Sequence, residues 1–398
     1  MPKFSDRAQR LPSSPIRKLA PFADAAKARG TKVYHLNIGQ PDIATPPQFF
    51  EAIAKADLQT LAYSPSAGFE SLREQIAAYY VRLGHEIKVD NVLVTTGASE
   101  ALDFVFRAIL DPEDEIVSPE PLYANYLSFS LGTDSVIVPV TSGVDEDFAL
   151  PSIAAFEERI TPKTRAILIC NPSNPTGIVY PREALLQLQT IAKKHDLFLI
   201  VDEVYREFVY DADESHFSSL GLTEIQDNVI VIDSVSKRFS ACGARIGCIV
   251  SRNQALMQQV LKMAQARLSP PTLGQVGAEA VYQLPPDFYD GVVKEYSKRR
   301  DLVRSALDKM EGVVCPKITG AFYAMVRLPV EDSEDFCRWL LEEFSHNGAT
   351  VMMAPGAGFY ATPGLGKDEV RIAYVLNSDD LMAAMDCLEA GLKAYAQR

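Results

Sequence analysis

From about residue 92 onward, short apolar runs alternate with longer segments in which apolar residues recur at helical spacing. The runs span residues 92–95, 115–118, 135–138, 166–169, 198–201 and 229–232, and the longer segments span residues 99–110, 150–159 and 181–195, with Pro181 in a first turn. Runs that are apolar on both faces and separated by helices are typical of a parallel sheet covered on both sides. The pattern therefore predicts an α/β domain with a mostly parallel sheet.

Two breaks in this pattern, together with the chain length, predict a second domain. A Pro-Pro pair at residues 285–286 precedes a long charged helical segment at residues 287–310, and the prolines within residues 41–47 favour an extended chain. A chain of 398 residues is also longer than one hydrophobic core usually supports. We expect a large domain at residues 46–285 and a small domain formed by residues 1–45 and 286–398.

Composition and charge narrow the possible functions. Hydrophobic residues make up 47% and charged residues 23% of the chain, which is ordinary for a globular protein. The formal net charge of −13 argues against a general binder of nucleic acid or anionic membranes, because both need a basic face. The first residues contain no apolar signal core and no segment has membrane-spanning length, so we expect a cytoplasmic protein.

The cysteine and histidine patterns predict neither a disulfide framework nor a metal site. The six cysteines are scattered and include no Cys-x-x-Cys pair, so we expect reduced thiols. The five histidines are equally dispersed, and no local group has zinc-ligand spacing.

Candidate functional residues follow the predicted strands, where ligands of parallel α/β sheets bind. Gly97, Ala98 and Ser99 follow the run at residues 92–95 after Thr96 and lie at the start of a helical segment. The free N–H groups and the dipole of a helix N-terminus would bind an anion there, such as a phosphate. The alternative is that Ser99 is an ordinary N-cap and Gly97 its turn.

Two further strand ends carry groups suited to a polar ring. Asn171 and Asn174 lie in a turn whose prolines fix the backbone, so their amides would be held for a ligand oxygen; the alternative is a plain tight loop. Asp202 follows the run at residues 198–201, and a buried carboxylate needs a cation, for which a protonated pyridine nitrogen would serve. The alternative for Asp202 is a helix cap, or a metal site with Glu203, although neighbouring strand residues point to opposite faces.

Lys237 and Arg371 are the candidate cationic groups. Lys237 follows the run at residues 229–232, with two serines before it and Arg245 after it. A lysine that is partly desolvated or close to another cation becomes a nucleophile, whereas the alternative is a solvated surface lysine. Arg371 lies in a strand-like segment and needs an anionic partner, either a substrate carboxylate or an internal salt bridge.

Residues 356–361 match the glycine pattern of a dinucleotide-binding turn. A segment containing proline and two glycines follows, where that fingerprint requires a helix. We therefore predict a mobile loop here.

Taken in order, these segments resemble the fold-type I aminotransferases that use pyridoxal 5′-phosphate, class I/II, the group of aspartate and aromatic aminotransferases. The resemblance covers nearly the whole chain and rests on residues 37–42, 63–68, 96–99, 121–126, 171–177, 202–205, 234–237, 320–323 and 371. The ordered set is far more specific than any one segment. It implies the aspartate aminotransferase-like fold, with a mostly parallel seven-stranded sheet between helices in the large domain and a smaller α+β domain from both termini.

The resemblance also implies roles for the matched residues. Lys237 resembles the lysine that binds the cofactor covalently and then acts as general base. Asp202 resembles the partner of the ring nitrogen, and Asn174 and Tyr205 would bind the phenolic oxygen of the ring. Tyr123 would stack on the ring, where the family commonly has tryptophan.

The same resemblance implies a phosphate site and a substrate site. The implied phosphate ligands are Ala98, Ser99, Ser234 and Arg245, joined by Tyr63 from a second subunit. Gly39 and Arg371, assisted by Asn174, would bind the substrate α-carboxylate. These roles imply a homodimer that moves an amino group from an L-amino acid to a 2-oxo acid, such as 2-oxoglutarate, by a ping-pong mechanism.

The resemblance favours an aspartate-like or aromatic amino acid as substrate. One branch of the family binds the distal carboxylate with a lysine near the phosphate-binding turn, where this chain has Ser99 and Glu100. In another branch an arginine lies just upstream of a Ser-Asn-Pro-Pro turn. Arg267 precedes a Ser-Pro-Pro turn, close to that pattern but not in register, so it is a hypothesis for binding the distal carboxylate.

Two other functions are open to this scaffold. A carbon–sulfur β-lyase, or a cyclising lyase, shares the cofactor residues and differs only in the fate of the carbanion. A non-catalytic regulator built on an aminotransferase-like domain would need a separate DNA-binding module, and the two expected domains occupy the chain. We rank the aminotransferase first, the lyase second and the regulator third.

Overall fold

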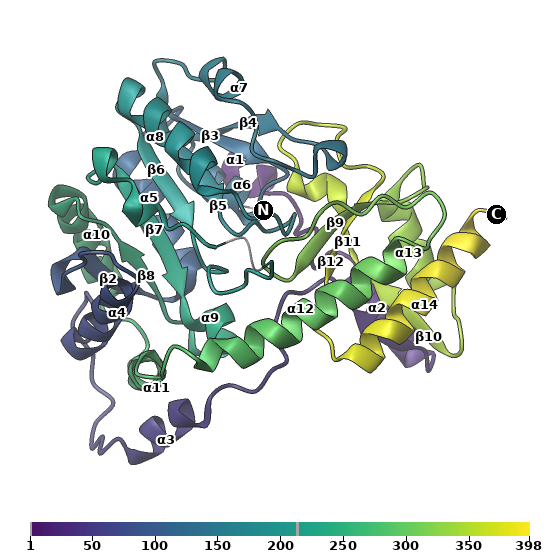
Figure 1. The fold of residues 1–398 in the computed structure, drawn as a ribbon, viewed down its shortest axis with the longest axis horizontal. Helices are drawn as coiled ribbons and strands as arrows, with labels where there is room; N and C mark the ends of the chain where they lie inside the picture. Colours follow the sequence, from purple (N-terminus) through teal and green to yellow (C-terminus); the bar gives the residue numbers. More distant parts are fainter. Residues whose placement is uncertain (1, 212–214) are drawn as a thin grey trace.

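A seven-stranded sheet forms the centre of the structure, a computed structural model that describes residues 2–211 and 215–398 (Figure 1). In spatial order the strands are β2 (Val92–Thr95), β8 (Gly247–Val250), β7 (Val229–Ser234), β6 (Phe198–Asp202), β5 (Thr164–Cys170), β3 (Glu115–Glu120) and β4 (Val136–Thr141). All neighbours pair in parallel except β8, which is antiparallel to both β2 and β7. The predicted mostly parallel sheet is thus confirmed.

Helices cover both faces of this sheet because successive strand residues point to opposite sides. Leu199 and Val201 of β6 belong to one core, whereas Ile200 between them belongs to the other. The first face packs against α4 (Glu70–Arg82), α7 (Ile153–Glu157), α8 (Arg182–His195) and α11 (Thr272–Tyr282). The second face packs against α5 (Gly97–Ile109), α6 (Asn125–Gly132) and α10 (Gln254–Arg267).

The two ends of the chain share one core, which a few large-domain side chains such as Val204 and Phe208 also join. Strand β1 (Lys32–His35) pairs in parallel with β10 (Ala349–Met352), and a second small sheet has the order β11 (Ala354–Pro355), β12 (Glu369–Ala373), β9 (Tyr323–Arg327). Around these strands lie α2 (Ala20–Ala28), α13 (Ser333–Glu342), α14 (Ser378–Tyr395) and the long α12 (Phe288–Leu307). Leu19 and Leu36 pack in one cluster with side chains from Tyr296 to Leu392.

This shared core accords with a small domain built from both termini. The exact division into residues 46–285 and residues 1–45 with 286–398 stays a prediction, and its first residue, Met1, lies outside the described part. The remaining α-helices are α1 (Asp6–Arg10), α3 (Pro47–Lys55) and α9 (Val235–Arg238). Across the described residues, no helix is both long and apolar enough to cross a membrane.

Three local expectations need correction. The helix expected from Ser99 begins at Gly97, and Pro181 lies just before α8 instead of in its first turn. The segment expected to be a loop at residues 356–361 contains a 3₁₀ helix (Gly356–Phe359). Phe359 is fully buried there because its ring packs 4.9 Å from the guanidinium of Arg371, and its carbonyl accepts a backbone hydrogen bond.

Candidate active site

A cavity of about 540 Å³ opens at the carboxyl ends of β6 and β7. It brings together eleven of the predicted residues: Gly39, Ala98, Ser99, Tyr123, Asn174, Asp202, Tyr205, Ser234, Lys237, Arg245 and Arg371. They come from nearly the whole length of the chain, so the fold itself assembles them. Tyr63 and Arg267 do not line this cavity.

Lys237 lies on α9, a single helical turn that directly follows β7. Ser234 caps this turn by accepting a hydrogen bond from the Ser236 N–H at 3.0 Å, and its own hydroxyl donates to the carbonyl of Ile246 at 2.9 Å. The Nζ of Lys237 donates to the carbonyl of Gly39 at 2.7 Å. The amine is therefore partly buried and points into the cavity, unlike that of a solvated surface lysine.

Gly39 must be a glycine for this contact to exist. A Cβ at this position would overlap the hydroxyl of Tyr323. The backbone of residue 39 therefore approaches both Lys237 and Tyr323 because it has no side chain.

Asp202 ends β6 and is 4% exposed. Its carboxylate accepts hydrogen bonds from the hydroxyl of Tyr126 at 2.9 Å and from the Val204 N–H at 3.3 Å. No described cation forms an ion pair with it, and burial raises its pKa to about 6. Glu203 points the other way, toward Ser218 and Ser219, as the alternation of strand residues predicts.

Arg371, on β12, is 1% exposed and also faces the cavity. It donates to the side-chain oxygen of Asn174 at 2.9 Å and to the carbonyl of Asn37 at 2.6 Å, while its Nε has no partner. The salt bridge offered as an alternative does not occur among the described residues, and burial lowers the pKa of this guanidinium. The site therefore fits a carboxylate brought by a ligand.

The turn between β2 and α5 also lines the cavity, through Ala98 and Ser99. The N-cap of α5 is Thr96, without a side-chain cap, so the reading of Ser99 as an N-cap is wrong. Gly97 has a φ of +76°, and a Cβ there would lie 2.5 Å from an Nη atom of Arg245. A glycine thus lets a guanidinium approach N–H groups that the helix leaves free, and the pair suits a phosphate.

Asn171 does not face the cavity. Its side-chain oxygen accepts from the Tyr180 N–H at 2.9 Å, and its amide donates to the Tyr180 carbonyl at 3.3 Å. Asn171 therefore stabilises the turn itself, as expected if this segment is a tight loop. Asn174, three residues later, is the one that reaches Arg371.

Among the cavity residues that were not predicted from the sequence, Tyr323 and Arg17 carry groups that can act on a ligand. Tyr323 has its hydroxyl 2.9 Å from that of Tyr205, and its ring lies 4.4 Å from the guanidinium of Arg371. The resemblance included its Gly-Ala-Phe-Tyr segment but gave it no role. Arg17 lines the cavity from the turn before α2. It follows no predicted strand, so the search for polar residues after strand ends did not include it.

The predicted residues Tyr63 and Arg267 lie outside the cavity. Tyr63 is 78% exposed, in the segment between α3 and α4. Arg267 forms an ion pair with Glu100 at 3.0 Å and donates to the carbonyl of Ser66 at 3.1 Å.

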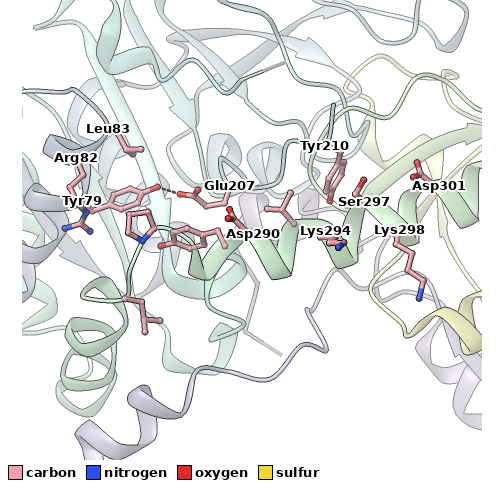
Figure 2. Close-up of a pocket in the computed structure, with 14 residues that line it drawn as sticks. Tyr79, Arg82, Leu83, Glu207, Tyr210, Asp290, Lys294, Ser297, Lys298 and Asp301 are labelled. Carbon is pink, nitrogen blue, oxygen red and sulfur yellow. Dashed lines mark hydrogen bonds between the residues drawn. The ribbon is translucent and has the colours of Figure 1, made fainter. Parts of the chain in front are cut away.

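A larger cavity of about 760 Å³ lies along α12 (Figure 2). Asp290, Lys294, Ser297 and Lys298 line it from that helix, and a hydrogen bond joins Tyr79 to Glu207 on its other side. None of the predicted site residues faces it, so the smaller cavity is the candidate active site.

The donor set of the smaller cavity fits pyridoxal phosphate. The cofactor has a carbonyl carbon, a ring nitrogen, a phenolic oxygen and a phosphate. The cavity offers a lysine amine, a buried carboxylate without an ionic partner, a tyrosine hydroxyl and a helix N-terminus beside an arginine. The fold and the site therefore define a pyridoxal-phosphate enzyme with the aspartate aminotransferase-like fold.

Comparison with known proteins identifies the family. The family model for aminotransferase class I and II matches residues 31–388, so the chain belongs to that family. It is 34% identical to a putative aminotransferase, YugH, of Bacillus subtilis over 96% of both chains. It is 31% identical to an aspartate aminotransferase of Pyrococcus horikoshii, over 98% of this chain and 97% of that one. A solved alanine aminotransferase from Pyrococcus furiosus superposes with a TM-score of 0.90 at 30% identity, covering 98% of this chain and all of its own.

The protein is thus an aminotransferase that depends on pyridoxal phosphate, as the sequence predicted. The relatives carry both aspartate and alanine aminotransferase names, so the family does not fix the substrate.

Proposed function

We propose that the 540 Å³ cavity is the active site and that Lys237 binds the cofactor's carbonyl carbon through Nζ. The observation that carries the proposal is that an amine, a buried carboxylate and a buried arginine, the last two without ionic partners, face one cavity. When bound, pyridoxal phosphate withdraws electrons from the substrate α-carbon and carries the amino group between the two half-reactions.

The residues around Lys237 would hold the cofactor ring. Asp202 keeps the ring nitrogen protonated, because its buried negative charge favours a cation beside it. Asn174 and Tyr205 donate hydrogen bonds to the phenolic oxygen, and Tyr123 packs on the ring face.

A second group would hold the phosphate. The proposed ligands are Ala98 and Ser99 through their N–H groups, the hydroxyls of Ser99 and Ser234, and the guanidinium of Arg245. Tyr63 of a second subunit completes the set.

The substrate α-carboxylate would bind Arg371, with Gly39 and Asn174 beside it. Once the substrate amine has replaced it on the cofactor, Lys237 would be the general base, with its Nζ holding the proton taken from the substrate α-carbon. The carbonyl of Gly39, which accepts a hydrogen bond from Nζ at 2.7 Å, orients the amine.

We infer a reaction that moves the amino group of an aspartate-like or aromatic L-amino acid to a 2-oxo acid such as 2-oxoglutarate. The aspartate aminotransferase names of several relatives support the aspartate-like choice. We also infer a cytoplasmic location, because all six cysteines are free thiols, the usual state in a reducing compartment.

We infer a homodimer from the apolar surface around Tyr63. The exposed hydrophobic side chains gathered on α3, the segment after it and the start of α11 are Phe50, Leu58, Leu61, Tyr63, Leu268 and Leu273. Helices α3 and α11 pack together, so these side chains share one region of the large domain (Figure 1). Such a patch on a protein surface is typical of a subunit interface.

A half-reaction panel tests the proposal. Amino acids are added singly to the cofactor-loaded protein, and the cofactor absorbance should shift for its donors without any 2-oxo acid present. The variant Lys237→Ala should lose the absorbance of the covalently bound cofactor. No shift with any amino acid would contradict the transaminase assignment, whereas release of pyruvate and ammonia from cystathionine would favour the lyase.

A further inference from the structure

The candidate active site contains one more cation than the proposed function uses. Among the described residues that line it, the cations are Arg17, Lys237, Arg245 and Arg371, against a single carboxylate, Asp202. This concentration of positive charge in a chain of net charge −13 indicates several anionic ligand groups. The proposed function assigns Lys237, Arg245 and Arg371 and leaves Arg17.

The guanidinium of Arg17 has no protein partner. Within residues 2–211 and 215–398 it forms neither a hydrogen bond nor an ion pair, and the residue is exposed. It is nevertheless close enough to Tyr123 to act on it: burial raises the pKa of Tyr123 to about 12, and the charge of Arg17 opposes that rise. The free cation therefore lies near the ring that would cover the cofactor.

The backbone of Arg17 is held in place relative to Arg371. Asn37 makes both connections: its carbonyl accepts from Arg371 at 2.6 Å, and its side-chain amide donates to the carbonyl of Ile16 at 2.6 Å. On the other side, a Cβ at Gly358 would lie 2.5 Å from Pro15, so the two chains are in close contact. One cation of the cavity is thus buried and the other is free, and Asn37 links the backbone beside Arg17 to the side chain of Arg371.

We propose that Arg17 binds the distal carboxylate of a dicarboxylic amino acid or 2-oxo acid whose α-carboxylate is held by Arg371. This inference rests on the proposed function and adds the substrate class. A guanidinium binds a carboxylate through two parallel hydrogen bonds. Arg17 would therefore favour dicarboxylates over monocarboxylates.

Arg17 is also a better candidate than Arg267 for this role. All three guanidinium nitrogens of Arg267 already have protein partners, including Glu100 at 3.0 Å. Its guanidinium also donates a hydrogen bond to the carbonyl of Ser66. Arg267 therefore stabilises the segment between α3 and α4, which contains Tyr63.

The test compares two donors in the half-reaction of the loaded protein. In Arg17→Gln, the second-order rate constant for aspartate should fall about 10- to 100-fold, the loss expected for a charge-assisted pair, and that for alanine less than about twofold. Arg17→Lys should recover part of the aspartate rate. Equal losses for both amino acids, or no loss, would overturn the proposal.

The matched control is Arg10→Gln. Arg10 is an exposed arginine of α1 that is paired with Asp134 at 3.4 Å and does not line the cavity. Its variant loses the same charge from the same terminal segment and should leave the aspartate-to-alanine ratio unchanged. If Arg267→Ala lowers this ratio and Arg17→Gln does not, Arg267 is the carboxylate ligand.

A binding measurement separates this proposal from the aminotransferase assignment. Succinate and butanoate are titrated into the loaded protein, and only the succinate dissociation constant should rise, about 10-fold or more, in Arg17→Gln. If no amino acid reacts but succinate binds in this way, the reaction assignment fails and the Arg17 site stands. If amino acids react and succinate binding is the same in both proteins, Arg17 is not the ligand.

Discussion

Tyr323 joins the two proposed halves of the site through one side chain. Its hydroxyl is 2.9 Å from that of Tyr205, the proposed ligand of the cofactor's phenolic oxygen. Its ring lies 4.4 Å from the guanidinium of Arg371, the proposed ligand of the substrate α-carboxylate. Tyr323 is therefore a positioning residue for both, and its hydroxyl and its ring can be separated by substitution.

We expect Tyr323→Phe and Tyr323→Leu to have different effects. The phenylalanine variant removes the hydroxyl beside Tyr205 but keeps the ring on Arg371, so it should shift the pH midpoint of the cofactor absorbance with little change in succinate affinity. The leucine variant also removes the ring and should weaken succinate binding about 2- to 10-fold. Absorbance titrations and succinate binding measure the two effects, and a phenylalanine variant that loses succinate binding equally would contradict this division.

Asp202 should make cofactor binding depend on pH. Burial raises its pKa to about 6, so it is ionised above pH 6 and takes up a proton as the pH falls through that value. At pH 8 the wild type should therefore bind pyridoxal phosphate about 10- to 100-fold more tightly than Asp202→Asn, and the two affinities should converge toward pH 5.

The ratio of the two affinities isolates Asp202, because the titration of the free cofactor is common to both proteins and cancels in the ratio. Calorimetry on the cofactor-free proteins at several pH values gives the ratio. A constant ratio from pH 5 to pH 8 would show that Asp202 does not carry the interaction.

At the residue scale, sequence reasoning found those groups that follow an apolar run. Asp202 and Lys237 lie directly after β6 and β7, where a parallel sheet gathers its ligands. Arg17 and Tyr323 have no such neighbour. They reach the cavity from the terminal segments of the chain, and only tertiary packing brings them there.

The short helix α9 depends on a buried ion pair behind Lys237. Arg238 donates to both carboxylate oxygens of Asp233, at 3.0 and 2.8 Å, and both side chains are fully buried. Tyr80 also donates to Asp233 at 2.9 Å. The pair ties the end of β7 to the residue after Lys237, and so limits the directions that this lysine can take.

We expect Asp233→Asn to lower the free energy of unfolding by about 3 kcal/mol, since it removes the charge that accepts two hydrogen bonds from the buried guanidinium and leaves only Glu207, at 3.7 Å from its Nε. Urea denaturation measures the change. The control is Glu113→Gln, which breaks the exposed pair with Lys163 and should leave the urea midpoint unchanged. Similar midpoints for the two variants would mean that the Asp233 charge contributes little.

At the scale of elements, the sequence predicted the parallel strands and not β8. The six predicted runs are rich in β-branched residues and all became strands of the large sheet, in slightly different bounds. β8 has only four residues, Gly247–Val250, and begins with glycine directly after the turn at Arg245. β2 is equally short, but it reads Val-Leu-Val-Thr, whereas β8 reads Gly-Cys-Ile-Val and has only two residues that favour a strand. Its antiparallel pairing with β2 and β7 is a long-range property that no local pattern indicates.

For the whole molecule, the family resemblance predicted long-range pairings that the pattern of apolar runs could not predict. Alternating runs predicted an α/β domain, but nothing local indicated that β1 pairs with β10, more than three hundred residues away. Two residues after β1, Asn37 bonds both Arg371 and the carbonyl of Ile16, the residue before Arg17. The order of the matched segments implied such an arrangement, and the shared core of the two chain ends accords with it.

The proposed dimer can be tested by mixing two inactive variants. Lys237→Ala lacks the amine, and Tyr63→Ala lacks the residue that we assign to the neighbouring cavity. In a mixed dimer, the Tyr63→Ala subunit keeps its own Lys237 and receives Tyr63 from its partner, so one site is complete. Refolding the two in equal amounts should therefore restore activity to about a quarter of that of the wild type.

The control mixture pairs Lys237→Ala with Arg371→Ala. Both residues line the cavity of their own subunit, so neither site of the mixed dimer is complete and activity should stay at the level of the separate variants. Recovery in the control as well would point to contamination or subunit-independent rescue. Absence of recovery in the first mixture, with mixed dimers demonstrated by a size tag on one subunit, would place Tyr63 outside the neighbouring site. The apolar patch around α3 would then need another explanation.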